Sequence, residues 1–119
     1  MNERTFKAKL RAKFKMHCYV QSMSSLGTAG TPDLWLSEKH DLWLEAKYDD
    51  VTKRFVKPKL SALQAQWLNN RHAQGRRVMV IVGTGPNEAI LYKNGEWNEG
   101  RFDRRPLNEV IEEILKYVL

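Results

Sequence analysis

The sequence has few of the residues from which disulfides and transition-metal sites are built. Cys18 is the only cysteine among 119 residues, which excludes an internal disulfide and any zinc site with several cysteine ligands. The three histidines, His17, His40 and His72, are scattered without the spacing of metal ligands. No arrangement of Ser, His and Asp stands out as a catalytic triad. We expect Cys18 to be a small buried hydrophobe.

Long hydrophobic runs are also missing. No run of about 18 apolar residues occurs and the N-terminus is charged throughout, so we expect no membrane span, no signal peptide and a soluble, intracellular protein. Acidic residues are outnumbered, since 20 Lys and Arg stand against 14 Asp and Glu and give a formal net charge of +6. This excess favours an anionic partner, most commonly nucleic acid, although a basic surface can serve solubility alone.

Hydrophobic periodicity predicts one α/β domain over residues 1–119. A helix is expected over residues 3–16, where Phe6, Leu10 and Phe14 form a stripe. A second helix begins with Ser61 and Gln64 in a capping box and ends before the glycine at position 75. The apolar residues 78–82 read as a strand buried on both faces, and residues 19–21 as a short strand.

The C-terminal third predicts a hairpin and a last helix. Residues 83–87 form a turn, and the Asn-Gly pair at 94–95 indicates a type I′ hairpin between residues 89–92 and 96–97. Asp103 is expected to cap the last helix, with Pro106 in its first turn. An apolar stripe in that helix packs on the sheet or, if it is wider than the core needs, on another subunit; it comprises Leu107, Val110, Ile111, Ile114, Leu115 and Val118.

The chain is organised around residues 31–47, which read as a β-hairpin that carries three charged groups. Alternation in its second strand puts Leu42, Leu44 and Ala46 on one face and Trp43, Glu45 and Lys47 on the other. If the strands pair around residues 37–40, Asp33 lies at the same end of the hairpin as Glu45 and Lys47. Two carboxylates and an ammonium then converge.

Such a cluster suits a hard cation. Mg²⁺ takes one or two carboxylates and keeps open positions for water and phosphate oxygens, so the pattern suggests metal-assisted phosphodiester hydrolysis. A neighbouring lysine can orient the attacking water or stabilise developing charge. The same residues also occur in an ordinary hairpin with a charged edge.

Further residues extend this candidate site. Glu3 shares the inward face of the first helix and is a candidate third acid, unless it only complements the helix dipole. A basic loop follows the hairpin, where a phosphate backbone would lie, and the basic face of the first helix also favours phosphate. The candidate DNA contacts are Lys53, Arg54, Lys57, Lys59, Lys7 and Arg11.

These residues carry a resemblance to a known family. Pro32 and Asp33, followed by Glu45, Ala46 and Lys47, resemble the signature of the PD-(D/E)XK nucleases. Within that superfamily the chain is similar to the small stand-alone, phage-type members of the VRR-NUC group. A Gly before the Pro-Asp pair, the helix around Gln64 and the strand 78–82 follow in the family's order.

The resemblance implies a restriction-endonuclease-like fold with a mixed central β-sheet flanked by helices. It implies a DNA endonuclease that uses Mg²⁺, with Mn²⁺ able to substitute, and leaves 5′-phosphate and 3′-hydroxyl ends. Asp33, Glu45 and the main-chain carbonyl of Ala46 would hold the metal, and Lys47 would act on the water or the phosphate. Gln64 matches a glutamine near the family's site, although its capping role competes for the same side chain. Relatives are typically homodimers, and the resemblance implies a bacterial cytoplasm as the setting, where a phage can encode such a protein.

Phosphate contacts without base readout favour recognition of DNA shape, such as a branch or a Holliday junction. One alternative is a sequence-specific homing or restriction-type endonuclease, which needs elements for reading the major groove. Another is a non-catalytic DNA-binding accessory protein on the same fold, but such a protein would be expected to have lost Asp33, Glu45 or Lys47.

Overall fold

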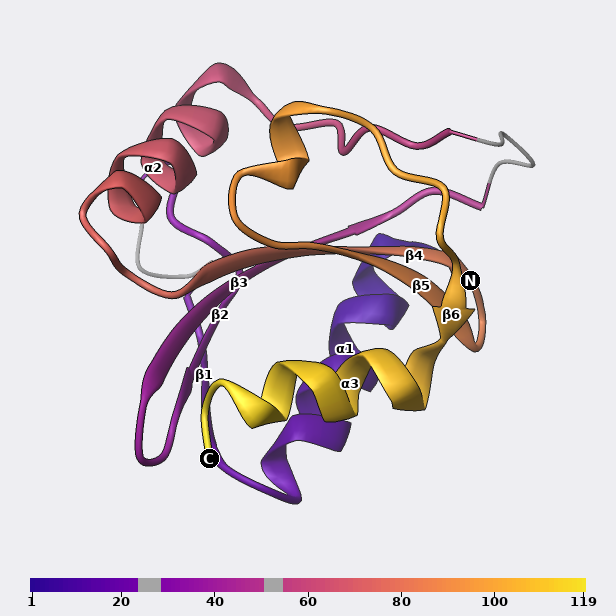
Figure 1. The fold of residues 1–119 in the computed structure, drawn as a ribbon. Coiled ribbons are helices and arrows are strands. Elements are labelled where there is room, and N and C mark those ends of the chain that lie inside the picture. Colours follow the sequence, from indigo (N-terminus) through magenta and orange to yellow (C-terminus); the bar gives the residue numbers. More distant parts are fainter. Residues whose placement is uncertain (24–28, 51–54) are drawn as a thin grey trace.

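Six strands form one mixed sheet with helices on both faces (Figure 1). The structure is a computed structural model, which describes residues 1–23, 29–50 and 55–119. The strands are β1 (Tyr19–Ser22), β2 (Leu34–Ser37), β3 (Asp41–Tyr48), β4 (Val78–Gly85), β5 (Glu88–Tyr92) and β6 (Arg105–Pro106), in that spatial order. Helices α1 (Glu3–Lys15) and α3 (Leu107–Lys116) cover one face; α2 (Ala62–Ala73) and the 3₁₀ helix η2 (Glu96–Asn98) lie on the other. The predicted α/β domain with a mixed central sheet flanked by helices is confirmed.

Strand β3 is the centre of this arrangement. It pairs antiparallel with β2 and parallel with β4, and α2 forms the crossover between the two parallel strands. Leu42, Leu44 and Ala46 point into the core under α1 and α3, where all three are fully buried. The predicted alternation is therefore correct, and it turns Glu45 toward the face that carries α2.

Each face of the sheet has its own core. The stripes predicted on the first and last helices are buried against one face, including every residue of the C-terminal stripe. The single chain thus covers that stripe without a second subunit. On the other face, Leu68 of α2 and Trp97 of η2 pack against Val80, Val82 and Tyr92. No helix in the described ranges is long and apolar enough to cross a membrane.

The predicted capping box of α2 is present. The Ser61 side chain accepts the Gln64 N–H at 3.1 Å, and Gln64 accepts the Ser61 N–H at 3.0 Å. At the other end Gly75 adopts φ 79°, the left-handed conformation that ends a helix. These local signals determine where α2 begins and ends.

The hairpin near the C-terminus differs from the prediction. Strand β4 continues to Gly85 and turns at residues 86–87 into β5, so residues 83–85 are strand and not turn. Asn94 and Gly95 do have positive φ values of 53° and 82°, but the chain then enters η2. The predicted hairpin is wrong because Trp97 is buried on the α2 face, where its indole N–H donates to Asn69 at 2.9 Å.

The predicted cap of the last helix is also wrong. Asp103 binds the guanidinium of Arg101 at 2.7 and 2.9 Å, and the N-cap position of α3 is Pro106, which makes no side-chain cap bond. The ion pair with Arg101 draws Asp103 away from the helix end.

Candidate active site

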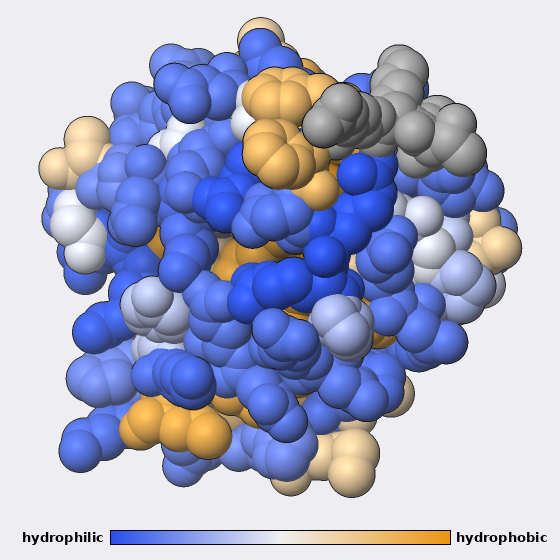
Figure 2. All heavy atoms as spheres, turned by 45° about the vertical axis from the view of Figure 1, so that its right-hand side comes forward, coloured by the Kyte–Doolittle hydropathy of each residue, from blue (hydrophilic) through white to orange (hydrophobic). Residues whose placement is uncertain are grey.

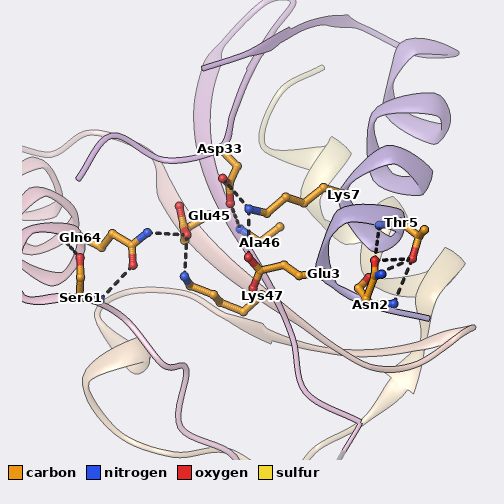
Figure 3. Close-up of polar contacts among 10 residues, drawn as sticks. All are labelled: Asn2, Glu3, Thr5, Lys7, Asp33, Glu45, Ala46, Lys47, Ser61 and Gln64. Atoms are coloured by element: carbon orange, nitrogen blue, oxygen red, sulfur yellow. Dashed lines mark hydrogen bonds and ion pairs between the residues drawn. The ribbon is translucent and has the colours of Figure 1, made fainter. Parts of the chain in front are cut away.

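Asp33 and Glu45 meet on neighbouring strands. Asp33 directly precedes β2, and the pairing of Leu34 with Leu44 continues by one residue to place Asp33 opposite Glu45. Both side chains lie between α1 and α2 (Figure 3). Asp33 is 9% and Glu45 1% exposed, so two carboxylates are removed from water at one point of the sheet.

Asp33 is held by one backbone group and one cation. Its Oδ2 accepts the Ala46 N–H at 2.9 Å, and its Oδ1 lies 2.9 Å from the Nζ of Lys7. Lys7 also lies 3.2 Å from Glu3, so it bridges the two acids. Burial acts to lower the pKa of Lys7, but the hydrogen bond and charge of Asp33 and the charge of Glu3 raise it overall. Lys7 is therefore a charged partner of the site, a contact that the sequence does not predict, and its role as a DNA contact stays a prediction.

Within the part of the chain that the structure describes, partners reach one oxygen of Glu45. Its Oε2 accepts the Gln64 amide at 3.1 Å and lies 3.4 Å from the Nζ of Lys47. Among the described residues no donor reaches its Oε1, which is buried. Burial and the negative charge of Asp33 raise the pKa of Glu45 to about 8, against the opposing charges of Lys47 and Lys7. A buried carboxylate oxygen without a donor is costly unless a proton or a cation binds there.

The donor set fits a hard divalent cation. Asp33 and Glu45 supply carboxylate oxygens, the ligands that Mg²⁺ prefers, and one of these oxygens has no hydrogen-bond partner among residues 1–23, 29–50 and 55–119. Within the described ranges no three His, Cys, Asp or Glu side chains converge as a metal-binding group. The acids of the site are thus a pair, with Glu3 linked to it through Lys7. The contact that Ala46 makes in the site is through its N–H, and a role for its carbonyl stays a prediction.

Basic residues flank the carboxylates. Lys57 and Lys59 are exposed and, with Glu3 and Lys47, line a small cavity of about 100 Å³. Arg11 and Lys7 border an open pocket of about 520 Å³ beside α1. Hydrophilic side chains dominate the face of the molecule seen in Figure 2. Lys53 and Arg54, the other predicted DNA contacts, lie outside the described residues.

The structure places the side chains of the predicted motif close together. Glu45 contacts both Gln64 and Lys47, and Asp33 lies opposite Glu45 on the neighbouring strand, as expected from strand alternation and the capping box. The ion pair between Lys7 and Asp33 was missed, because it joins helix α1 to the start of β2 and no local pattern encodes it. The four-residue spacing of Glu3 and Lys7 could have indicated the ion pair between those two residues, but not the one with Asp33.

Comparisons with known proteins add no assignment. Neither a scan against protein-family models nor a search of curated proteins found a match to this chain. The function must therefore be inferred from the site itself.

Proposed function

We propose that the protein is a metal-dependent endonuclease that hydrolyses DNA phosphodiester bonds, with branched DNA as its preferred substrate. The observation that carries the proposal is the placement of Asp33, Glu45 and Lys47 on adjacent strands, with two buried carboxylates beside one ammonium. The resemblance of the same residues to the PD-(D/E)XK signature supports it independently of their geometry.

Each residue has a role in this proposal. Asp33 and Glu45 would hold Mg²⁺, with one ligand atom in the Oε1 of Glu45, which no donor among the described residues reaches. Such a metal would supply the charge that neutralises the phosphate and lowers the pKa of an attacking water. Lys47 lies beside Glu45 and is 17% exposed in its side chain, so its ammonium can reach a phosphate oxygen or orient the water. Gln64 positions Glu45 through their hydrogen bond.

The basic flanks would bind the DNA backbone. Lys57 and Lys59 adjoin the cavity that contains Lys47, so phosphates bound there would lie next to the carboxylates. Contacts of this kind recognise the path of the backbone and not the base sequence, which favours a branch or junction over a sequence-specific site.

A homodimer is part of the proposal because two sites related by a two-fold axis would suit cleavage of two strands of a junction. The apolar stripe of α3 is used within the chain, so a dimer would have to use other surfaces of α1 or α3. Sedimentation analysis of the purified protein tests this point.

The test of the nuclease is cleavage of a four-way junction and of a linear duplex of matched sequence. Wild type and Asp33→Ala are compared, each with Mg²⁺ and with EDTA. We expect junction cleavage that is lost in the variant and in EDTA. Cleavage of the duplex at one sequence would instead indicate a homing or restriction-type enzyme. Binding without any cleavage would indicate an accessory protein.

A further inference from the structure

A row of aromatic rings crosses the α2 face of the sheet, outside the carboxylate site. Trp35 of β2 stacks on Trp43 of β3, with ring centroids 5.7 Å apart and planes inclined by 16°. Trp67 of α2 meets Trp43 edge to face at 5.7 Å, and the guanidinium of Arg71 lies 5.4 Å from the Trp67 ring centre. Tyr19 of β1 continues the row beyond Trp35, at 5.6 Å.

This row begins beside the candidate active site. Trp43 and Glu45 are two residues apart on one face of β3, a separation of about 7 Å. On α2, Gln64 and Trp67 are three residues apart and therefore share a side of the helix. Gln64 contacts Glu45, and Trp67 contacts Trp43. The same two elements thus supply both the carboxylate site and the first pair of rings.

Positive charge surrounds the aromatic row. Trp43 and Trp67 line a groove of about 660 Å³. Its other lining residues include four cationic side chains, Lys39, Arg71, Arg76 and Arg77, which are all exposed. Asp41 is the one acidic side chain among the described lining residues, and its carboxylate accepts hydrogen bonds from Trp35 at 3.1 Å and Ser37 at 2.6 Å.

The rings are not sealed in a core. Trp35, Trp43 and Trp67 are each only partly buried, whereas the aliphatic residues of the same face, such as Val80 and Ile90, are fully buried. Partly exposed rings beside arginines suit a ligand that has flat rings and negative charges along its length. Unpaired nucleotides have both, because each base offers a π face and each linkage a phosphate. The bases of a duplex are stacked on one another and cannot enter such a groove.

We propose that this groove binds an unpaired DNA strand next to the scissile phosphate, with bases on Trp43 and Trp67 and phosphates on Arg71, Arg76 and Arg77. The inference deepens the proposed function, on which it rests for the identity of the nucleic acid. The substrate class it names is branched DNA with a single-stranded segment at the branch point.

The test measures binding in EDTA, so that cleavage does not enter. Fluorescence anisotropy is recorded with a labelled oligothymidylate of about twelve nucleotides, a blunt duplex of the same length and an oligoglutamate of similar charge. The variants are Trp67→Ala, Trp67→Phe and Arg71→Ala, with Lys116→Ala as the control, because Lys116 is an exposed cation at the end of α3, where it lines a different pocket. Thermal melting checks that each variant is folded.

We expect Trp67→Ala to weaken oligothymidylate binding by at least about fivefold, the loss typical of one stacked base. Trp67→Phe and Lys116→Ala should stay within about twofold of wild type, and duplex binding should change by less than about twofold in both Trp67 variants. Arg71→Ala should lower the affinity for oligothymidylate. It should also reduce the slope of log affinity against log salt by about 0.7, the contribution of one phosphate contact on a single strand. Because Arg71 is exposed, this second variant tests the groove even if Trp67→Ala fails to fold.

Oligothymidylate binding that is unchanged in folded Trp67→Ala and in Arg71→Ala would overturn the inference, and so would equal binding of oligoglutamate. The proposed nuclease activity would still stand after such results if wild type cleaves junctions with Mg²⁺. Conversely, binding of oligothymidylate through Trp67 without cleavage of any DNA would refute the proposed nuclease activity and support single-strand binding in the groove.

Discussion

The side-chain amide of Gln64 donates to the carboxylate of Glu45 over 3.1 Å, while its carbonyl oxygen accepts the Ser61 N–H over 3.0 Å. One side chain therefore caps α2 and orients a residue of the candidate active site at the same time. From the sequence alone, these two roles compete for one side chain. The two ends of the amide point in different directions, so the side chain makes both contacts at once.

This double role predicts different outcomes for two capping variants. Ser61→Ala removes the side chain that accepts the Gln64 N–H and should cost about 1 kcal/mol of stability. Gln64→Ala should cost a similar amount and also leave the Oε2 of Glu45 without its amide donor. We expect junction cleavage per folded molecule to fall about tenfold or more in Gln64→Ala and to stay near wild type in Ser61→Ala. Equal activity in the two variants would show that Gln64 only caps the helix.

Lys47 is expected to act in the chemical step. Its ammonium lies 3.4 Å from Glu45, and Lys47→Ala should reduce cleavage by a factor of about 10² to 10³ or abolish it, because a charge that stabilises the reacting phosphate is lost. Metal-dependent DNA binding should be largely retained, as measured by anisotropy with Ca²⁺. The distant Lys116→Ala, which removes the same charge, should cleave normally. A fully active Lys47→Ala protein would remove Lys47 from the mechanism.

The sequence predicted the central part of this site because it is encoded locally. Asp33, Glu45 and Lys47 lie on one hairpin, and the period of two along β3 fixes which of its side chains face α2. Gln64 was found through the capping box, which needs only a spacing of three residues. Local patterns of this kind do not depend on how distant elements pack.

The features that the sequence analysis missed or predicted wrongly depend on packing between distant segments. Lys7 reaches Asp33 because α1 lies against the sheet near the start of β2. Trp97 is not part of a hairpin strand because it is buried next to Asn69 of α2, to which its indole N–H donates. Asp103 is predicted from the sequence to cap the last helix, but in the structure it forms an ion pair with Arg101. The row of aromatic rings, Tyr19 included, likewise joins three strands and a helix, so no single stretch of sequence predicts it.

The raised pKa of Glu45 predicts that stability depends on pH. Burial and Asp33 raise this pKa from about 4.5 to about 8, so the folded protein without metal holds a proton on Glu45 that the unfolded chain releases at lower pH. The stabilising contribution of the protonated carboxyl is complete below pH 4.5 and is lost as the pH rises toward 8. Glu45→Gln cannot ionise. We therefore expect it to gain stability relative to wild type between pH 6 and pH 8.5, measured by urea unfolding in EDTA.

Glu113 provides the matched control for this experiment. Burial acts to raise its pKa, but hydrogen bonds from Lys93 and Arg105 lower it overall, so Glu113 is ionised throughout the measured range. The difference between Glu113→Gln and wild type should therefore be constant from pH 6 to pH 8.5. A constant difference for Glu45→Gln as well would show that the Glu45 pKa is not raised.

The salt dependence of DNA binding should identify the phosphate-binding flank. Lys57 is exposed and lines the same cavity as Lys47, so Lys57→Ala should remove one phosphate contact. Each such contact contributes about 0.9 to the slope of log affinity against log salt for duplex DNA. We expect the slope to fall by about that amount in Lys57→Ala and to be unchanged in Lys116→Ala. An unchanged slope in both would place the DNA on another surface.

The ion pair between Lys7 and Asp33 predicts a link between Lys7 and metal binding. Lys7→Met keeps much of the apolar stem but removes the charge that compensates Asp33, so in EDTA the variant should lose about 1 to 3 kcal/mol of stability. A divalent cation at Asp33 and Glu45 would replace that charge. We therefore expect saturating Mg²⁺ to raise the Tm of Lys7→Met more than that of wild type. Lys9→Met is the control on the same helix, because the ammonium of Lys9 binds Asn87 at 2.9 Å, in the turn between β4 and β5. If Mg²⁺ stabilised all three proteins equally, Asp33 would not be a metal ligand, since the charge next to it would then have no effect on the cation.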